Sequence, residues 1–434
     1  MAIFEKIVYY IANEKIDLKC YPNYSFEIGD IDGDGRKELI SLNQSATLLS
    51  AFNLDGELLF EKNLDNTGNW GTTLICAADI DSDGRDEIIV PNGDSIVAFD
   101  GKGNKIREYK HHSSGKDGYG VSVPLIGAAK IKSPDEWSIV AVLAEGEAVA
   151  LDRAFNEIWK TGGMGHDFGH EIFFADIDGD GLDEICFSTI GCAGQTADGW
   201  NFGELILLDH DGSILLRKRV DDYVRDNHFD DTAMADFMGN GTSQILLEKG
   251  VLLDLNGNII WDISDKFDHG QWIAHTPDPN GKGRIVFISE LWGAKKRGLL
   301  FSGNGEVIND FKDLPWVVFD SEEHKNLDLT PLPSRAHIIQ WTPESEPEIF
   351  LSQQSLLPSS SHLCYQTVSF QLKALFMDLR GGLLGEFPFN DSQIKGYFYN
   401  GEVHSKVADI DGDGHQEIIF PKQDGHVMII KKKA

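Results

Sequence analysis

Basic residues and cysteines are scarce in this sequence, and long apolar segments are absent. The 434 residues include 38 Lys and Arg against 70 Asp and Glu, which gives a net charge of −32. Such a field opposes non-specific binding to nucleic acids, so we expect no nucleic-acid partner. The apolar run at residues 7–11 is too short for a signal peptide or a membrane span, so we expect neither on this chain, and no membrane partner.

The five cysteines form no metal-binding or redox motif, because they are scattered along the chain. Cys76 and Cys186 lie in apolar segments and are predicted to be buried thiols. Pairing of Cys186 with Cys192 across a loop is an alternative. Glycine, by contrast, is abundant at 45 residues, which is typical of a chain with many tight turns.

The acidic residues are concentrated in a motif, Asp-x-Asp-x-Asp-Gly-x-x-Glu, that occurs four times. Each copy is followed by an apolar run, and the first is also preceded by a strand-like segment at residues 26–28. The motif therefore connects two predicted strands. The acidic positions of the four copies are Asp30, Asp32, Asp34 and Glu38; Asp79, Asp81, Asp83 and Glu87; Asp176, Asp178, Asp180 and Glu184; and Asp409, Asp411, Asp413 and Glu417.

Carboxylates at this spacing are typical of a calcium loop. Ca²⁺ prefers six to eight oxygen ligands from flexible acidic segments, and a Gly at the sixth position permits the tight turn. The closing Glu stands at the ninth position here, whereas in an EF-hand it stands at the twelfth and the flanks are helical. We therefore predict Ca²⁺ as the cofactor of all four loops. The alternative is a polar turn that holds no metal.

A second pattern alternates with the acidic motif and predicts a hairpin. Its first copy, residues 49–60, has two apolar segments around an Asp-Gly turn, and related segments recur along the chain. Each repeat thus contains four antiparallel strands, and repeats of this length predict an all-β protein with a single β-propeller domain over residues 1–434. We count eight blades, with seven as the alternative because the repeats near Lys130 and Trp341 are weak. The last repeat is one strand short, and residues 6–11 are predicted to supply that strand and close the ring.

Polar and aromatic residues gather where the first strands of the later blades begin. In a propeller these positions surround the mouth of the central channel, opposite the acidic loops, and the long insertions fall on the same face. Several His, Arg and Tyr side chains in one concavity predict an acid–base site. The alternative is that each His is structural and bonds a neighbouring blade. The residues are His166, His170, His228, His269, Gln271, Arg335, Tyr397, Tyr399 and His404.

The acidic strand–loop–strand with its hairpin resembles the FG-GAP/VCBS class of calcium-loop propellers over nearly the whole chain. The segments at residues 169–181, 228–231 and 269–271 also resemble those of propeller polysaccharide lyases, which include rhamnogalacturonan, ulvan and rhamnose–glucuronate lyases. This resemblance implies β-elimination at C4 of a uronic acid next to rhamnose, in an acidic polysaccharide or oligosaccharide. The repeats near Lys130, Asp236, Asp278 and Trp341 depart from the motif, which leaves the number of calcium sites open.

β-Elimination requires a cation that neutralises the uronate, a base that removes the C5 proton and an acid that protonates O4. The resemblance suggests Arg335, or a Ca²⁺ held by Asp230 and Asp231, as the neutralising cation. His170 or His228 would be the base and Tyr397 or Tyr399 the acid. Trp200 and Trp272 would stack on sugar rings, with His166, His269, Gln271 and His404 as further substrate contacts.

Two other functions fit the same pattern. A non-catalytic propeller that binds a glycan or a protein would have the same fold and calcium loops but no turnover. A quinone-dependent dehydrogenase is a weaker alternative, because the tryptophans at strand ends, such as Trp159 and Trp261, are not regular. We expect a monomer. Calcium loops of this type favour an extracellular location, although the chain shows no signal peptide.

Overall fold

The computed structural model describes most of the strands and acidic loops of the chain, and every structural statement below concerns those residues. It divides into two compact units, Tyr24–Lys266 and a second formed by Met1–Asn23 with Phe267–Ala434. Within the described residues no helix is long and apolar enough to cross a membrane. The described residues are 4–10, 26–43, 46–66, 74–112, 122–164, 168–189, 203–219, 223, 231–267, 270–290, 298–311, 318–319, 330–356, 370–389, 405–421 and 426–432.

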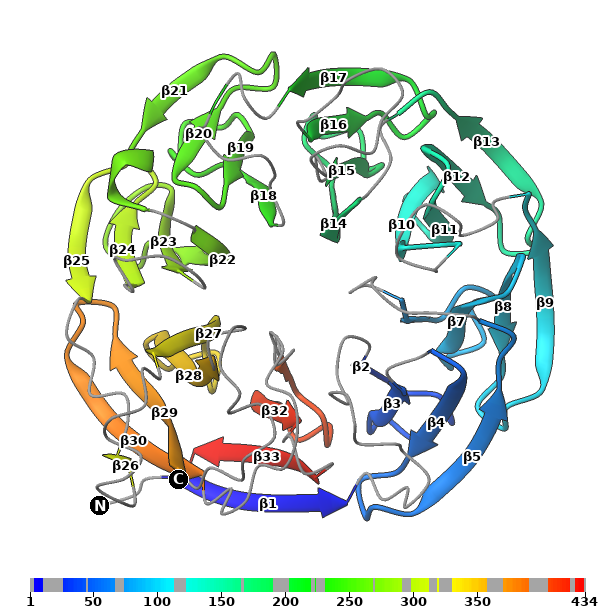
Figure 1. The fold of residues 1–434 in the computed structure, drawn as a ribbon, viewed down its shortest axis with the longest axis horizontal. Helices are drawn as coiled ribbons and strands as arrows, with labels where there is room; N and C mark the ends of the chain where they lie inside the picture. Colours follow the sequence, from blue (N-terminus) through cyan, green and yellow to red (C-terminus); the bar gives the residue numbers. More distant parts are fainter. Residues whose placement is uncertain are drawn as a thin grey trace, which may run out of the picture. The chain divides into compact units, whose positions relative to one another are not determined.

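The unit Tyr24–Lys266 contains five four-stranded antiparallel blades, each formed by consecutive strands (Figure 1). Blade 1 is β2 (Phe26–Gly29), β3 (Glu38–Leu42), β4 (Leu48–Phe52) and β5 (Leu58–Asn63); blade 2 is β6 (Cys76–Ala78), β7 (Glu87–Asn92), β8 (Ser95–Phe99) and β9 (Lys105–Lys110); blade 3 is β10 (Leu125–Ser133), β11 (Glu136–Leu143), β12 (Glu147–Leu151) and β13 (Glu157–Thr161); blade 4 is β14 (Phe168–Ala175), β15 (Glu184–Thr189), β16 (Glu204–Leu208) and β17 (Ile214–Arg219); blade 5 is β18 (Thr232–Ala235), β19 (Gln244–Leu247), β20 (Val251–Leu253) and β21 (Ile259–Asp262).

The second unit contains blades 6, 7 and 8. A short 3-10 helix, η2 (Ser264–Lys266), precedes blade 6 in the chain. Blade 6 is β22 (Gly270–Pro277), β23 (Arg284–Glu290), β24 (Gly298–Ser302) and β25 (Val307–Phe311); blade 7 is β27 (Thr330–Ile339), β28 (Glu348–Leu356), β29 (Phe370–Asp378) and β30 (Leu383–Phe389), with β26 (Val318–Phe319) paired to β29; blade 8 is β31 (Lys406–Ala408), β32 (Glu417–Pro421), β33 (His426–Lys432) and β1 (Phe4–Tyr10).

The chain is therefore an eight-bladed β-propeller, as predicted, and the seven-bladed alternative is wrong. The weak repeats near Lys130 and Trp341 form complete blades 3 and 7. The predicted closure is also confirmed, because β1 pairs antiparallel with β33 from Phe4 opposite Lys432 to Tyr10 opposite His426. In Figure 1 the two strands lie side by side, although they come from opposite ends of the sequence.

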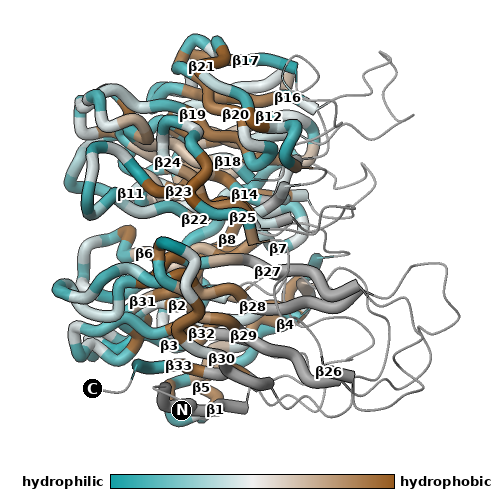
Figure 2. Tube along the Cα trace, turned by 90° about the vertical axis from the view of Figure 1, so that its left-hand side faces the viewer, coloured by the Kyte–Doolittle hydropathy of each residue, from teal (hydrophilic) through white to brown (hydrophobic). Residues whose placement is uncertain are grey.

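Buried aliphatic side chains fill the spaces between neighbouring blades. Between blades 1 and 2, Ile40 and Leu49 pack in one cluster with Ile88 and Val97, each fully buried. Similar clusters join blades 2 to 3, 3 to 4, 4 to 5 and 6 to 7. Figure 2 shows this pattern as hydrophobic middle strands between hydrophilic turns. Apolar and polar residues alternate little along the middle strands, because both faces of each middle strand are covered by another blade.

A short hydrogen-bonded clamp also joins adjacent blades at the acidic loops. Asp30 N donates to Asp86 Oδ2 at 2.8 Å, and Asp86 N donates back to the Asp30 carbonyl at 2.8 Å. Lys130 and Asp183 repeat this exchange between blades 3 and 4, at 2.7 and 2.9 Å. Asp86 and Asp183, which stand just before the closing glutamates, therefore fix the acidic loops of blades 2 and 4 against the preceding blades.

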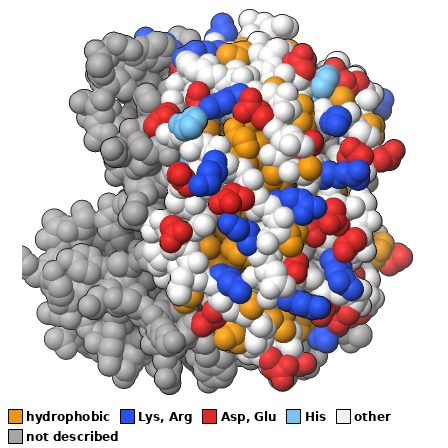
Figure 3. Space-filling model, turned by 90° about the vertical axis from the view of Figure 1, so that its right-hand side faces the viewer, with side chains coloured by type: hydrophobic (Ala, Val, Ile, Leu, Met, Phe, Trp, Pro, Cys, Tyr) orange, Lys and Arg blue, Asp and Glu red, His pale blue; other side chains and the backbone are white. Residues whose placement is uncertain are grey.

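The outer face of blades 2 and 3 carries charges of both signs. Figure 3 views the protein from the side of β9 and β13, where Lys and Arg side chains alternate with Asp and Glu and with apolar residues. Lys105 and Glu108 form an ion pair of 3.0 Å on β9. The large negative charge of the chain therefore forms no single acidic patch on the described part of this face.

Cys76 and Cys186 are both buried, which confirms the prediction for these two thiols. The Cys186 sulfur lies 3.7 Å from Thr232 Oγ1, and burial raises the pKa of this thiol to about 12. Cys186 has no disulfide partner among the described residues. Cys192 itself lies outside the described residues.

Candidate metal centres

The four acidic loops have the same backbone form, which depends on glycine at the sixth position. Gly35, Gly84, Gly181 and Gly414 all have φ between 85° and 89°, a left-handed conformation that residues with a Cβ rarely adopt. In each loop this glycine donates its N–H to the first Asp, at distances of 2.8 to 3.0 Å. The turn thereby draws the first carboxylate toward the centre of the loop.

The closing Glu is buried and fixed by one of its two oxygens. Oε2 of Glu38, Glu87, Glu184 and Glu417 accepts the N–H of the second loop residue, at 3.0, 3.1, 2.8 and 3.0 Å. These four residues are only 1 to 5% exposed. Because Oε2 is used in this way, Oε1 is the oxygen left to bind a ligand.

In every intact loop three acids meet closely enough to hold one cation. Their ligand atoms lie within 4.8 Å of one another. The fifth-position residues Asp34, Asp83 and Asp413, predicted as ligands, do not join these groups, and their Oδ1 atoms instead accept a backbone N–H two residues on. The groups are Asp30, Asp32 and Glu38; Asp79, Asp81 and Glu87; Asp176, Asp178 and Glu184; and Asp409, Asp411 and Glu417.

The electrostatics of these groups favour a bound cation. Burial, followed by repulsion from neighbouring Asp residues, raises the pKa of all four closing glutamates to about 7, although Lys431 opposes the rise at Glu417. Buried oxygens without a hydrogen-bond partner among the described residues occur in the loops of blades 2, 4 and 8: Asp81 Oδ1, Glu184 Oε1, Asp409 Oδ1, Asp411 Oδ1 and Glu417 Oε1. A hard divalent cation would satisfy these oxygens and restore the ionised carboxylates, so the residues present fit Ca²⁺.

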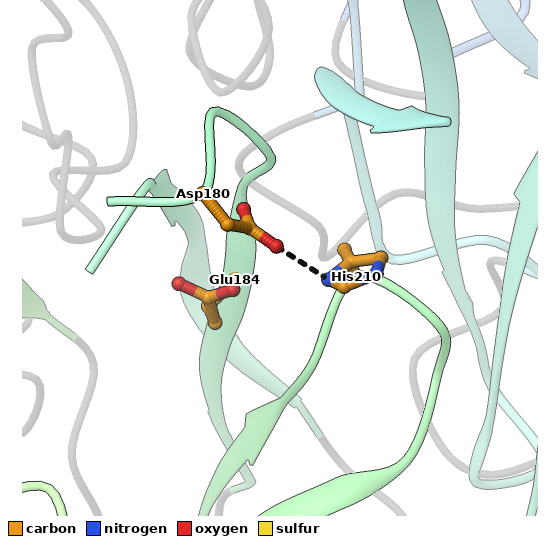
Figure 4. A group of neighbouring side chains, drawn as sticks. All are labelled: Asp180, Glu184 and His210. Atoms are coloured by element: carbon orange, nitrogen blue, oxygen red, sulfur yellow. Dashed lines mark ion pairs between the residues drawn. The ribbon is translucent and has the colours of Figure 1, made fainter. Parts of the chain in front are cut away.

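Blade 4 adds an imidazole to its loop, as Figure 4 shows. His210 follows β16 in the hairpin to β17, and its Nδ1 lies 3.7 Å from Asp180 Oδ2 and 2.8 Å from Asp209 Oδ1. Asp180, Glu184 and His210 form a second group whose ligand atoms lie within 4.8 Å. Two oxygens and one nitrogen suit Mn²⁺ or Zn²⁺ better than a set of oxygens alone. His210 was not among the residues predicted from the sequence. A histidine in this hairpin nevertheless distinguishes blade 4 from blades 1 and 2.

Blade 8 differs because a lysine reaches its acidic loop. The ammonium of Lys431, on β33, donates to Asp411 and lies 3.4 Å from Glu417 Oε1 and 3.6 Å from Asp413 Oδ2. Burial alone would lower the pKa of Lys431, but the hydrogen bond to Asp411 and the surrounding carboxylates raise it. Among the described residues, no Lys or Arg comes within ion-pair distance of the acids in the loops of blades 1, 2 and 4.

In two of the degenerate repeats a side chain of the protein takes over the role of a cation at the closing position. In blade 7, Glu348 accepts the indole N–H of Trp341 at 2.9 Å and pairs with Lys432 from β33. In blade 6 the closing position is Arg284, which donates to His275 Nδ1 at 2.7 Å. Burial, followed by the charge of Arg284, lowers the pKa of His275 to about 4.

The other two degenerate repeats need no cation. Gln244 closes the blade 5 loop, accepting the Phe237 N–H at 2.8 Å while its own amide donates to the Thr242 carbonyl. Blade 3 has only a tight turn at Pro134 and Asp135 between β10 and β11. The eight blades thus share one architecture and differ in the residue at the closing position and in the groups that pair with it.

The structure describes little of the predicted acid–base site. His170 lies in β14, Gln271 in β22 and Arg335 in β27, but their side chains are outside the described part. Trp272 is 1% exposed, so its ring does not present a face on which a sugar could stack. Outside the described residues altogether are His166, Trp200, His228, Asp230, His269, Tyr397, Tyr399 and His404.

Asp231 is described and lies in a buried charged group that the sequence did not predict. It is 2% exposed, and its N–H donates to Glu248 Oε2 at 2.7 Å. Glu248 in turn pairs with Lys249 at 2.9 Å, and both are almost fully buried. The group stands at the end of blade 5 where the first strand begins, which is the end predicted to carry the acid–base residues.

Comparisons with known proteins agree with the fold and the loops. Residues 30–90, which span the acidic loops of blades 1 and 2, match the FG-GAP-like repeat family. The rhamnogalacturonan exolyase YesX of Bacillus subtilis (strain 168) is 26% identical over 366 residues, covering 65% of this chain and 55% of that protein. The rhamnogalacturonan endolyase YesW of the same organism is 25% identical over 359 residues, covering 65% of this chain and 53% of that protein. The chain thus spans about half the length of these relatives.

Solved structures show the same fold. The crystal structure of rhamnogalacturonan lyase YesW covers 95% of this chain and 72% of its own, with a TM-score of 0.58 and 17% identity. A rhamnogalacturonan lyase of Bacillus licheniformis gives the same coverage, with a TM-score of 0.57 and 17% identity. The chain is therefore a β-propeller with an FG-GAP-like repeat and a fold that is also found in rhamnogalacturonan lyases.

Proposed function

We propose that this chain is a polysaccharide lyase that cleaves a glycan containing rhamnose and a uronic acid by β-elimination. The observation that carries the proposal is the sequence similarity to two rhamnogalacturonan lyases over 65% of the chain. The shared propeller fold supports it. An acidic polysaccharide or one of its oligosaccharides would be the substrate.

The proposed reaction breaks one bond and creates one double bond. A base removes the proton from C5 of the uronate, the electron pair forms the C4–C5 double bond, and the C4–O4 bond breaks. An acid donates a proton to the leaving O4. His170 or His228 is proposed as the base, Tyr397 or Tyr399 as the acid, and Arg335 or a cation at Asp230 and Asp231 as the group that neutralises the carboxylate.

Calcium is proposed to stabilise the propeller at the acidic loops of blades 1, 2 and 4 and to take no part in bond breaking there. In blade 2, for example, Asp79, Asp81 and Glu87 would supply oxygens, including the orphaned Asp81 Oδ1. A bound cation would offset the burial and the repulsion from neighbouring Asp residues that raise the pKa of Glu87. The loop would then hold β6 and β7 in register.

The test is a lyase assay on polysaccharides that contain rhamnose and a uronic acid, followed by the ultraviolet absorbance of the unsaturated uronate. We expect absorbance to rise on one such substrate. The rise should be lost in His170→Ala or His228→Ala protein, whichever residue is the base, and kept in His112→Ala protein, which changes an exposed residue after β9. Binding of the glycans without any product would contradict the proposal and favour a non-catalytic binding propeller.

A further inference from the structure

The position that faces the closing glutamate has a different residue in blade 8 than in the other intact blades. Ile418 pairs with Ile430, so the next residue, Lys431, lies beside Glu417. In blade 1, Leu39 pairs with Phe52, so the residue beside the closing glutamate is Asn53. In blades 2 and 4 the corresponding residues are Asp100 and Asp209. Lysine is therefore specific to the last of the four loops.

The reason lies in how blade 8 is completed. In blade 2, Asp100 is the first residue of the hairpin to the fourth strand, and its Oδ1 accepts the N–H groups of Lys102 and Asn104 at 2.9 and 2.8 Å. In blade 1, Asn53 makes the corresponding bonds to Asp55 and Glu57. No hairpin is needed after β33, because β1 supplies the fourth strand, and β33 continues straight through Lys431. The position is thus released from its role in a turn.

The released side chain reaches the oxygens that a metal would need. Lys431 Nζ donates to Asp411 and lies 3.4 Å from Glu417 Oε1, the oxygen that the backbone of Ile410 leaves unused. It is also 3.6 Å from Asp413. Asp411 and Glu417 belong to the group that would hold the cation. A divalent ion could enter this group only against a positive charge already within about 4 Å, which is strongly unfavourable.

We propose that Lys431 is the resident cation of the blade 8 loop, so that this loop, unlike those of blades 1, 2 and 4, does not bind Ca²⁺ tightly. The inference rests on the proposed occupancy of the other three loops. The neighbouring Lys432 does the same for Glu348 of blade 7, where the acidic motif has already been lost. Two consecutive lysines of β33 thus place a positive charge beside the closing glutamates of two blades.

The test counts calcium sites by equilibrium dialysis in the full chain and in variants of this position. We expect Lys431→Met to add one tight site, with an affinity at least about tenfold above that of the same loop in the unchanged protein. Lys431→Arg, which keeps the charge, and Lys432→Met, which removes a lysine that contacts no acid of this loop, should add none. Glu417→Gln placed on Lys431→Met should remove the added site.

The unchanged protein provides a result even where a variant does not fold. If calcium binds the unchanged chain tightly and Glu417→Gln removes one of its sites, the loop is occupied and the inference is wrong. It is also wrong if a folded Lys431→Met protein gains no site. Absence of tight binding to any loop would instead overturn the calcium proposal itself, and this inference with it.

Discussion

Blade 1 and blade 8 carry nearly the same acidic loop and differ in the side chain beside it. In both, the closing glutamate is buried and accepts the N–H of the second loop residue at 3.0 Å. Beside Glu38 stands Asn53, which is engaged in its own hairpin, whereas beside Glu417 stands the ammonium of Lys431. The loop motif alone therefore does not decide which cation the loop carries.

The degenerate blades extend this comparison. Blade 7 keeps the glutamate and satisfies it with Trp341 and Lys432, and blade 6 replaces the glutamate by Arg284. Blade 5 uses the neutral amide of Gln244. A buried carboxylate in a propeller blade needs a partner, which in blade 7 is an indole and a lysine, whereas blades 5 and 6 replace the carboxylate itself.

The largest expected effect comes from removing calcium, which should affect the loops of blades 1, 2 and 4. An ion present at a hundredfold excess over its dissociation constant contributes about 2.7 kcal/mol to the free energy of unfolding per site. We expect a chelator to lower the melting temperature by on the order of 10 °C, and added Ca²⁺ to restore it. Scanning calorimetry with and without chelator measures this. An unchanged melting temperature would show that none of the loops depends on a metal.

Matched glutamine substitutions in blades 1 and 8 should affect calcium binding differently. Glu38→Gln removes a negative ligand from a loop with no other cation, so calcium-loaded protein should lose one site and roughly 2 to 3 kcal/mol of stability. Glu417→Gln should leave the number of tight sites unchanged, because Lys431 still pairs with Asp411. Calcium titration followed by thermal unfolding reads both effects. Equal losses of calcium in the two variants would remove the distinction.

Proton competition should weaken calcium binding at the intact loops. Burial, with repulsion from nearby Asp residues, raises the pKa of Glu38, Glu87 and Glu184 to about 7 in the metal-free protein. Below that pH each glutamate must release a proton before it can bind the ion, so the apparent affinity should fall about tenfold per pH unit. Above it the affinity should level off. A calcium affinity that stays constant from pH 7 down to pH 5 would contradict these raised pKa values.

The smallest effect is expected in blade 4, where His210 distinguishes the loop from those of blades 1 and 2. His210→Asn should weaken Mn²⁺ binding by roughly tenfold and change Ca²⁺ binding little, since imidazole nitrogen is a good ligand for Mn²⁺ and a poor one for Ca²⁺. Mn²⁺ binding can be followed by electron paramagnetic resonance. His415→Asn, in the exposed part of the blade 8 loop, is the matched control. Equal weakening of both ions would indicate that His210 only supports the loop.

Much of the fold was predictable because its signals are local. The Asp-Gly turns, the acidic loops and the apolar runs each lie within one hairpin, so their spacing alone indicated eight blades and a closing N-terminal strand. The contacts that distinguish the blade 8 loop from the other acidic loops are made by residues far apart in the sequence. Lys431 meets Asp411 from 20 residues away, and only the register of β32 and β33 places it there.

The acid–base site could be predicted only in outline. Residue types at the starts of first strands suggested it, but burial is decided by packing between blades, and Trp272 proved to be interior. The buried group of Asp231, Glu248 and Lys249 was missed for the same reason, because the sequence gives no sign that Glu248 and Lys249 turn inward after β19.

The central claim is that nearly identical acidic loops carry different cations, and anomalous X-ray diffraction from crystals grown with Ca²⁺ tests it most directly. The account predicts anomalous density at the acidic loops of blades 1, 2 and 4, beside Glu38, Glu87 and Glu184. At blade 8 it predicts none, with the Lys431 ammonium on Asp411 instead. Calcium bound beside Glu417, with Lys431 turned away, would contradict it.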